Sequence, residues 1–151
     1  MFSKKCSYAI RAILYLATLQ SNNYIKIDEI AEELDIPFHF LTKILQILTH
    51  KDLSITRRGP KGGIALDRPF ENITLFEIAY AVDGEKYVNG CALGLAECKD
   101  DSPCPLHDQY IAERDRMVTY LKATTIGEMS KKIKHLDLRL TKDYETMEVE
   151  A

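Results

Sequence analysis

The chain has 151 residues, a length that suits one compact domain or a small domain with a helical extension. Hydrophobic residues make up 46% of it, enough for a core, but no apolar run approaches the roughly 20 residues that a membrane-spanning helix needs. The N-terminus lacks the apolar stretch and cleavage site of a signal peptide. We therefore expect a cytosolic protein whose four cysteines are thiols or metal ligands rather than disulfides.

The net charge of −3 is unevenly distributed. Residues 1–69 hold 10 basic and 7 acidic side chains, whereas residues 70–151 hold 10 basic and 16 acidic ones. A basic region on an acidic body is typical of a protein that contacts nucleic-acid phosphates through one surface.

Three helices are predicted in the first 50 residues. The first, about residues 3–19, has one apolar face, made by Cys6, Ile10, Ile13, Leu14 and Ala17. The second begins near Asp28, a suitable N-cap, and Pro37 opens the third, over about residues 37–50. The third helix points a set of apolar side chains inward: Leu41, Ile44, Leu45 and Leu48.

The opposite face of this third helix is polar and carries His39, Thr42, Lys43, Gln46 and His50. Two short helices joined by a tight turn, the second with a polar stripe, are typical of a helix-turn-helix. Taken alone, such a stripe is more often an ordinary solvated helix face.

The hairpin that follows favours DNA binding. Residues 53–57 and 63–66 alternate in hydrophobicity, as two short strands should. The glycine-rich turn between them carries three cations, Arg57, Arg58 and Lys61. Glycine lets the backbone approach a phosphate closely, and arginine suits phosphates or a narrow minor groove. A hairpin of this kind directly after a helix-turn-helix is a wing. We therefore predict phosphate contacts from Lys43, Arg57 and Lys61, and base contacts from His39, Thr42 and Gln46.

The second half of the chain is predicted to be helical around one loop. Capping boxes at Thr74–Glu77 and Thr125–Glu128 predict two helix starts. A long helix is expected from about Pro103 to Ala123. It shows more apolar surface than the small body can cover, so we expect it to pair with its copy in a second chain rather than to pack back on its own domain. From Lys131 onward the chain is charged and weakly patterned, and we expect a fraying tail.

The predicted fold is thus mainly α, with a small β-hairpin wing and a long C-terminal dimerisation helix. We expect a winged helix-turn-helix DNA-binding domain over residues 1–82 and a ligand-binding loop over 83–104. The dimerisation helix and a short last helix occupy 105–130, and a flexible tail occupies 131–151.

Three cysteines and one histidine lie close together in the loop and at the expected start of the long helix: Cys91, Cys98, Cys104 and His107. Soft thiolates select zinc or iron–sulfur clusters, and histidine can replace cysteine on an iron. Cys104 and His107 are three residues apart, so both can face one point, and a helix N-terminus there would favour the Cys104 thiolate. The paired C-x2-C spacing of simple zinc sites is absent. Metal binding is predicted, with the metal left open and buried structural thiols as the alternative.

These motifs together resemble the winged-helix regulators that include the iron–sulfur cluster regulator (IscR), the nitric-oxide-sensitive repressor (NsrR) and the cysteine-metabolism repressor (CymR). The resemblance covers about residues 1–130. It rests on four segments: Ser7-Tyr8-Ala9, Leu41-Thr42-Lys43, Arg58-Gly59-Pro60-Lys61-Gly62-Gly63 and Cys98-x5-Cys104-x2-His107. It implies a homodimer on a partly palindromic operator in double-stranded DNA, and an iron–sulfur cluster, 2Fe–2S favoured over 4Fe–4S, whose state sets DNA affinity.

Carried over position by position, the resemblance assigns cluster cysteines to Cys91, Cys98 and Cys104. It assigns the completing histidine to His107 and the minor-groove arginine to Arg58. Thr42 stands where IscR-like proteins have a glutamate that affects operator choice, so that selectivity does not transfer. The first cysteine loop has six residues where IscR-like members have five. The NsrR-like branch takes an aspartate ligand from the partner chain's first helix, where this chain has Ser7 beside Cys6. Cys6 is therefore a candidate for an extra ligand donated by the partner chain, although its place on an apolar stripe favours burial.

The function predicted is a DNA-binding transcription regulator whose cluster senses iron–sulfur status, redox state or nitric oxide. A first rival keeps the winged helix but makes the cysteines a thiol or zinc switch or a protein-docking site. A second rival is an enzyme using a Cys–His pair, which lacks a third catalytic group and leaves the wing unexplained. We therefore predict that the chain is not an enzyme.

Overall fold

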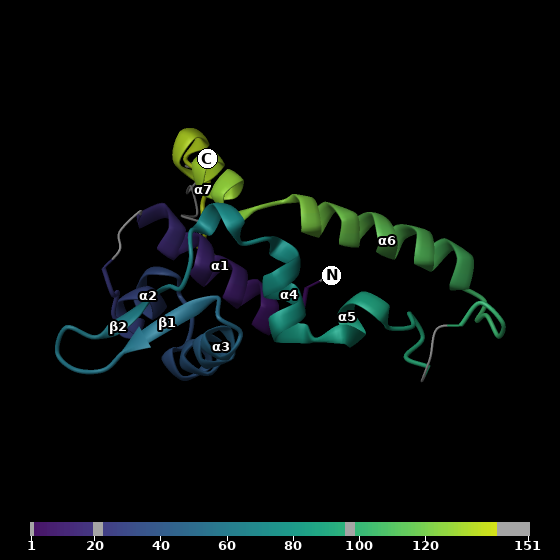
Figure 1. Ribbon diagram of the computed structural model, residues 1–151, viewed down its shortest axis with the longest axis horizontal. Coiled ribbons are helices and arrows are strands. Elements are labelled where there is room, and N and C mark those ends of the chain that lie inside the picture. Colours follow the sequence, from purple (N-terminus) through teal and green to yellow (C-terminus); the bar gives the residue numbers. More distant parts are fainter. Residues whose placement is uncertain (1, 20–22, 96–98, 142–151) are drawn as a thin grey trace, which may run out of the picture.

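The computed structural model describes residues 2–19, 23–95 and 99–141, without the side chains of Lys86 and Tyr87. Figure 1 shows a compact head of short helices and a hairpin, from which α5 and α6 extend on one side. The elements in chain order are α1 (Lys4–Leu19), α2 (Ile27–Glu33), α3 (Phe38–His50), β1 (Ser54–Arg57), β2 (Gly63–Leu66), the 3-10 turn η1 (Phe70–Asn72), α4 (Leu75–Asp83), α5 (Glu85–Asn89), α6 (His107–Ala123) and α7 (Ile126–Leu136).

The predicted fold class is confirmed: the protein is mainly helical, with one small hairpin wing. β1 and β2 pair antiparallel, with Ser54 opposite Leu66 and Arg57 opposite Gly63. A backbone bridge between Ile25 and Ile64 ties the hairpin to the chain before α2. None of the helices in the described residues is both long and apolar enough to cross a membrane.

The core is built around α1, which packs against α3, α4 and α7. Its predicted apolar face is confirmed, because all five residues of that stripe are buried: Cys6, Ile10, Ile13, Leu14 and Ala17. The inward face of α3 is confirmed in the same way by Leu41, Ile44, Leu45 and Leu48. The periodic apolar residues of these two helices therefore pack against each other, and the polar stripe of α3 faces away from the core.

Helix starts agree with the prediction where a side chain caps them. Thr74 and Thr125 each accept a hydrogen bond from the backbone of the glutamate three residues on, so both capping boxes are confirmed. The expected N-cap at Asp28 is wrong by two positions. α2 begins at Ile27 after Lys26, and the Asp28 carboxylate accepts from the Glu29 N–H at 3.0 Å inside the first turn.

α7 extends to Leu136, beyond the point at which a fraying chain was expected from Lys131. Residues 131–136 are helical because the last helix keeps an apolar side toward α1. Ser130 is buried, and Met129 and Ile133 pack against the core.

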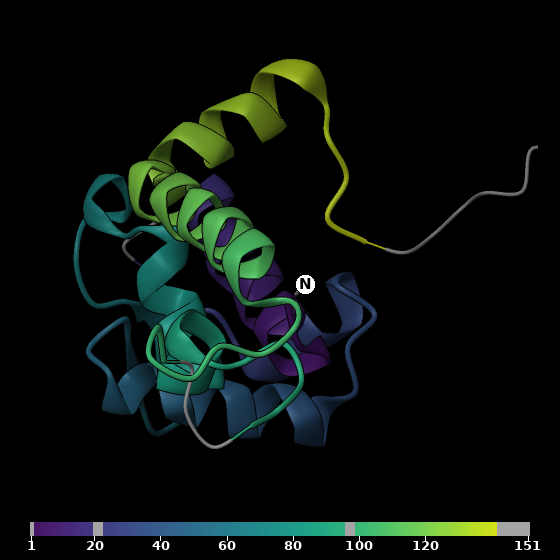
Figure 2. The same cartoon turned by 90° about the vertical axis from the view of Figure 1, so that its right-hand side faces the viewer.

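α6 begins at His107, four residues later than expected, and it has little contact with the head. Only His107 and Leu121 are buried along its 17 residues. Met117 and Tyr120 are 46% and 57% exposed. Figure 2 turns the start of α6 toward the viewer, and the chain that leads directly into it lies below α6 in this view. We call residues 85–107 the arm.

Candidate nucleic-acid interface and cysteine centre

The polar stripe of α3 is accessible to a partner. His39, Lys43, Gln46 and His50 are exposed, and Thr42 is half-buried. The Thr42 hydroxyl donates to the Phe38 carbonyl at 2.9 Å, so a base edge would meet its oxygen as an acceptor unless that bond breaks.

The wing presents its three predicted cations to solvent, since Arg57, Arg58 and Lys61 are all exposed. The Gly62 N–H donates to the Gly59 carbonyl at 2.9 Å and closes the turn. A Cβ at Gly62 would lie 2.2 Å from the Arg57 carbonyl oxygen, so a side chain there would open the turn. Glycine at position 62 therefore lets the two sides of the turn approach each other closely, and this keeps the cations on a narrow loop.

A groove of about 750 Å³ separates the wing from the starts of α2 and α3. Lys26, Ile27 and Asp28 line it from the start of α2, Phe38 lines it from α3, and wing residues 56–60, 62 and 63 line it from the hairpin. Phe38 is 47% exposed. Lys26 on one side and Arg57 and Arg58 on the other thus bring cations to the groove, as contact with a phosphate strand requires, and Asp28 adds one carboxylate beside Lys26. The sequence analysis missed Lys26 and Phe38. The one available signal for Phe38 was a large apolar residue at the start of α3, outside the inward stripe of that helix.

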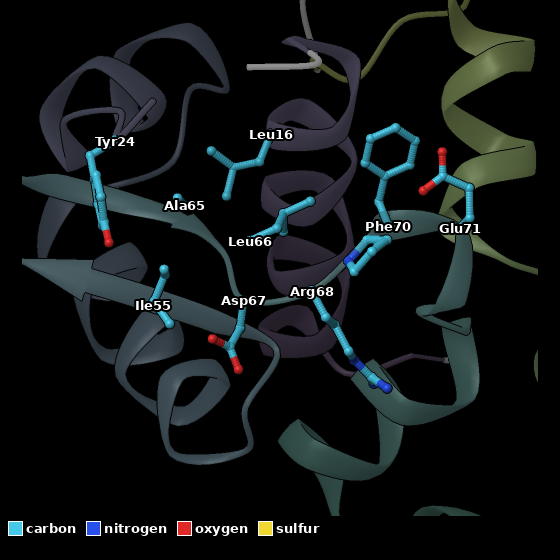
Figure 3. A pocket seen from close by; sticks show the side chains of 10 residues that line it. Leu16, Tyr24, Ile55, Ala65, Leu66, Asp67, Arg68, Phe70 and Glu71 are labelled. Carbon is cyan, nitrogen blue, oxygen red and sulfur yellow. The ribbon is translucent and has the colours of Figure 1, made fainter. Parts of the chain in front are cut away.

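A second hollow lies at the base of the wing (Figure 3). It has a volume of about 470 Å³ and is lined by apolar side chains from α1, β1, β2 and η1, among them Leu16, Ile55, Leu66 and Phe70. The charged residues Asp67, Arg68 and Glu71 line it as well. The Tyr24 ring also lines it, and the Arg57 guanidinium lies 5.9 Å from the centre of that ring. This contact links a wing cation to the head and limits its range of positions.

The arm brings two of the predicted ligand cysteines together. Cys91 and Cys104 are both half-buried, and the Cys104 thiol hydrogen-bonds to the Cys91 sulfur. Hydrogen bonds from the backbone of Leu93 and Leu95, with smaller effects of Cys104 and of the Gly94 backbone, hold the pKa of Cys91 below its usual range. Gly94, with φ of +71°, makes the tight turn that aims these backbone groups at the sulfur. The Cys91 sulfur is therefore prepared to carry negative charge.

Cys104 precedes α6 instead of lying in its first turn, which corrects the prediction of a helix start near Pro103. Pro105 disfavours the helical conformation at the residue before it, so the helix can begin only later. His107 is then the first helical residue, and its N–H donates to the Cys104 carbonyl at 3.0 Å. The positive end of the α6 dipole was expected at Cys104, but it lies three residues further along, at His107.

His107 is buried, with 5% of its side chain exposed, and its Nε2 lies 2.9 Å from an Asp100 carboxylate oxygen. Within residues 2–19, 23–95 and 99–141, no three His, Cys, Asp or Glu side chains are close enough to share a metal ion. Cys98, the remaining predicted ligand, lies outside the described residues.

Cys6 is fully buried on α1. Burial, with a smaller effect of the nearby Asp83 carboxylate, raises the pKa of its thiol to about 12. This environment is the one expected of the buried alternative, and a bond to a partner's metal would require α1 to move.

Comparison with known proteins identifies the family. The profile of the Rrf2 family, described as an iron-dependent transcriptional regulator, matches residues 2–132. The chain belongs to the Rrf2 family of transcriptional regulators.

Individual proteins agree with this. A protein of Aquifex aeolicus named as an HTH-type transcriptional regulator is 31% identical over 132 residues, covering 85% of this chain and 90% of its own. The regulator IscR of Escherichia coli is 26% identical over 90% of this chain and 83% of its own. The structure of CymR, the global cysteine regulator of Bacillus subtilis, matches with a TM-score of 0.73 at 21% identity, over 87% of this chain and 96% of its own.

The resemblance stated from the sequence is thereby confirmed, as is the prediction of a regulator rather than an enzyme. Membership of this family also supports DNA as the partner.

Proposed function

We propose that this Rrf2-family regulator binds its operator with an affinity set by an iron–sulfur cluster in the arm, held by Cys91, Cys98, Cys104 and His107. One observation carries the proposal: Cys91 and Cys104 lie together in the arm, and hydrogen bonds from the backbone of Leu93, Leu95 and Gly94 and from Cys104 lower the pKa of the Cys91 thiol. Hydrogen bonds to sulfur stabilise thiolates and tune cluster potentials. The donor set of this chain therefore fits a cluster, 2Fe–2S favoured, and a bound cluster would supply reversible electron transfer.

The proposed ligands connect the end of α5 to the start of α6. Cys91 follows α5, whereas Cys104 and His107 stand at the start of α6. Holding these side chains on one centre fixes the start of α6 relative to the head. We further propose that α6 pairs with its copy through Met117 and Tyr120, which are exposed in the single chain. The spacing of two α3 helices on a partly palindromic operator then depends on the state of the arm.

Different residues of the head contact different parts of the DNA. Lys43, Arg57 and Lys61 neutralise phosphates, Arg58 enters the minor groove, and His39, Thr42 and Gln46 meet base edges. In the dimer, the two heads can be spaced in a DNA-binding or a non-binding arrangement. The cluster shifts the equilibrium between these arrangements only by as much as its affinity differs between them. A cytosolic location remains a prediction.

The test is anaerobic reconstitution with iron and sulfide, followed by absorption spectra and native mass of wild type and of Cys98→Ala. Cys6→Ala is the matched control, since it removes one thiol outside the arm. We expect a coloured dimer for wild type and Cys6→Ala and a colourless protein for Cys98→Ala. Affinity for an operator selected from random duplexes should differ between loaded and iron-free wild type. A wild type without iron, or an affinity indifferent to it, contradicts the proposal.

The contact between Cys91 and Cys104 also favours one second candidate, a thiol switch. With hydrogen peroxide as oxidant, the two thiols would lose two protons and two electrons to give a disulfide and two waters. This candidate would be supported instead by a protein that stays colourless after reconstitution, loses operator affinity when treated with peroxide and regains it when treated with dithiothreitol.

A further inference from the structure

Resting on the DNA-binding half of the proposed function, we propose that Phe40 determines part of the operator sequence by contacting the methyl group of a thymine in the major groove. Phe40 lies in the first turn of α3. None of the base and phosphate contacts proposed above involves it, and its role follows from its exposure and its position on the helix.

The first turn of α3 carries two phenylalanines that the core does not cover. Phe38 is 47% exposed and Phe40 is 57% exposed, whereas Leu41 and Ile44 on the inward face are at most 1% exposed. A single exposed apolar residue is ordinary on a protein surface and needs no partner. Two of them in this turn are placed where a recognition helix reads DNA, because its N-terminal residues are the ones that reach base edges.

The two rings lie on opposite edges of the polar stripe. Successive residues are about 100° apart around a helix, so Phe38 and Phe40 flank His39, one on each side. Phe38 lies on the edge toward the wing, because it lines the groove between the wing and Lys26. Its ring also meets the His39 imidazole edge-on, with ring centroids 5.7 Å apart. Phe40 therefore lies on the edge away from the wing.

The charges beside Phe40 favour DNA as its partner. Lys43 follows Phe40 by three residues, so it is its neighbour on the helix surface, and it is exposed. α3 contains no aspartate or glutamate. β1 packs against α3, and the hairpin lies next to this helix at the lower edge of the head in Figure 1. Phosphate contacts from Lys43 and from the wing cations would bring the ring against a duplex.

The chemistry of the phenyl ring limits which base it can favour. The ring has neither a donor nor an acceptor, so it distinguishes bases only through apolar contact. In the major groove thymine presents a methyl group, whereas adenine and guanine present an acceptor at N7 and cytosine presents an amino donor. Covering one of these polar groups with an apolar ring leaves it without a hydrogen-bond partner, which costs free energy. Phe40 therefore favours thymine, and burial of one methyl group raises affinity about fourfold.

Deoxyuridine isolates this contact, because it differs from thymidine only by the missing methyl group. The probe is the operator that wild type selects from random duplexes, with each thymine replaced singly. The full chain is used in whichever state, loaded or iron-free, binds more tightly. For wild type, replacement of one thymine in a half-site should lower affinity about fourfold in fluorescence anisotropy. For Phe40→Ala the same replacement should have almost no effect, because the ring that covered the methyl group is gone.

Phe38→Ala is the matched control, since it removes the same ring from the same turn on the edge toward the wing. It should keep the fourfold dependence on that methyl group. Both rings are exposed, so circular dichroism should show both variants folded. Neither variant loses a charge, so the salt slope should match that of wild type. Phe40→Leu keeps an apolar side chain and should keep part of the methyl dependence, which provides the test if Phe40→Ala binds too weakly to measure.

Three outcomes overturn the inference. The first is an equal loss on deoxyuridine replacement in wild type and Phe40→Ala at every thymine, and the second is an operator in which no thymine methyl group affects wild-type binding. The third is a Phe40→Ala variant with unchanged operator affinity and an altered native mass, which would assign Phe40 to a protein interface instead. A wild type that selects an operator but binds no iron overturns the cluster proposal alone. A wild type that selects no operator in either state overturns both.

Discussion

Alanine at Gly63 should destabilise the head far more than alanine at Gly59, although both glycines lie in the wing with positive φ. Gly63 has φ of +148°, and a Cβ there would lie 2.2 Å from the Ile25 carbonyl oxygen. That oxygen accepts from the Ile64 N–H at 2.8 Å, and the Ile25 N–H donates back to the Ile64 carbonyl at 2.9 Å. An added methyl group must therefore separate the wing from the chain before α2.

The magnitude follows from these contacts. A non-glycine residue at positive φ costs about 1 kcal/mol, and this cost is shared by both variants. Loss of the two backbone hydrogen bonds adds about 1 kcal/mol each at Gly63 alone. The expected loss of unfolding free energy is thus about 3 kcal/mol for Gly63→Ala and about 1 kcal/mol for Gly59→Ala, whose Cβ would have no neighbour within 4 Å. For a chain of this length, 1 kcal/mol corresponds to about 2–4 °C in Tm.

Thermal unfolding followed by circular dichroism measures the difference, at one fixed protein concentration because association shifts Tm. Urea unfolding should give the same order with unchanged slopes. Variants that agree within about 0.5 kcal/mol would show that the Ile25–Ile64 bridge does not hold the wing, and the reasoning would fail.

Three further predictions concern phosphate contact, a helix cap and a buried thiol. Lys61→Ala should reduce the slope of log affinity against log salt by about 1, whereas Gln46→Ala should weaken binding to the selected operator and leave that slope unchanged, as filter binding across a salt series would measure. Thr125→Ala should cost about 1 kcal/mol of unfolding free energy in urea by removing the capping box of α7, whereas Thr119→Ala, which loses only a hydroxyl bond to a carbonyl within α6, should cost less. Because the pKa of the Cys6 thiol is raised to about 12 in the folded state, the unfolded chain releases this proton first as pH rises. Stability should therefore fall by about 1.4 kcal/mol per pH unit above about pH 9 relative to Cys6→Ala, as urea unfolding across that pH range would measure.

Each of these has an outcome that contradicts it. An unchanged salt slope for Lys61→Ala would place the wing away from the phosphates. Equal costs at Thr125 and Thr119 would mean that packing alone determines where α7 begins. Parallel stability curves for wild type and Cys6→Ala between pH 9 and pH 11, roughly the range over which a free thiol has ionised and this one has not, would show that the thiol is solvated.

The faces of the helices were predictable from the sequence, because a face is set by side-chain periodicity. Leu41, Ile44, Leu45 and Leu48 repeat at helical spacing, and the polar stripe of α3 follows from them. The two capping boxes were equally local, since Thr74 and Thr125 each need only a glutamate three residues on.

Helix ends without a side-chain cap were less predictable. The start of α6 was placed too early, although Pro105 already carried the signal: the residue before a proline avoids the helical region. Lys131 was expected to begin a fraying tail, but it continues a helix whose apolar side packs on α1. Charge composition does not show such packing.

Contacts between segments that are distant in the sequence could not be predicted from sequence patterns. Lys26 and Phe38 meet the wing across a groove that only the tertiary fold creates. Asp100 was one of several acidic residues in a loop, and nothing in the spacing distinguished it from Asp101. The pairing of Cys91 with Cys104 depends on the turn at Gly94, which sequence alone placed only in a loop.

The point where α4 ends, at Asp83, and the arm begins has a practical consequence. The Ser3 backbone N–H and hydroxyl both donate to the Asp83 carboxylate, and the Ser3 hydroxyl oxygen accepts from the Cys6 N–H at 3.1 Å. The N-terminus therefore lies beside α4, immediately before the arm begins (Figure 1). A purification tag or reporter fused ahead of Phe2 would be anchored at this joint, so fusions for binding assays belong at the other end of the chain.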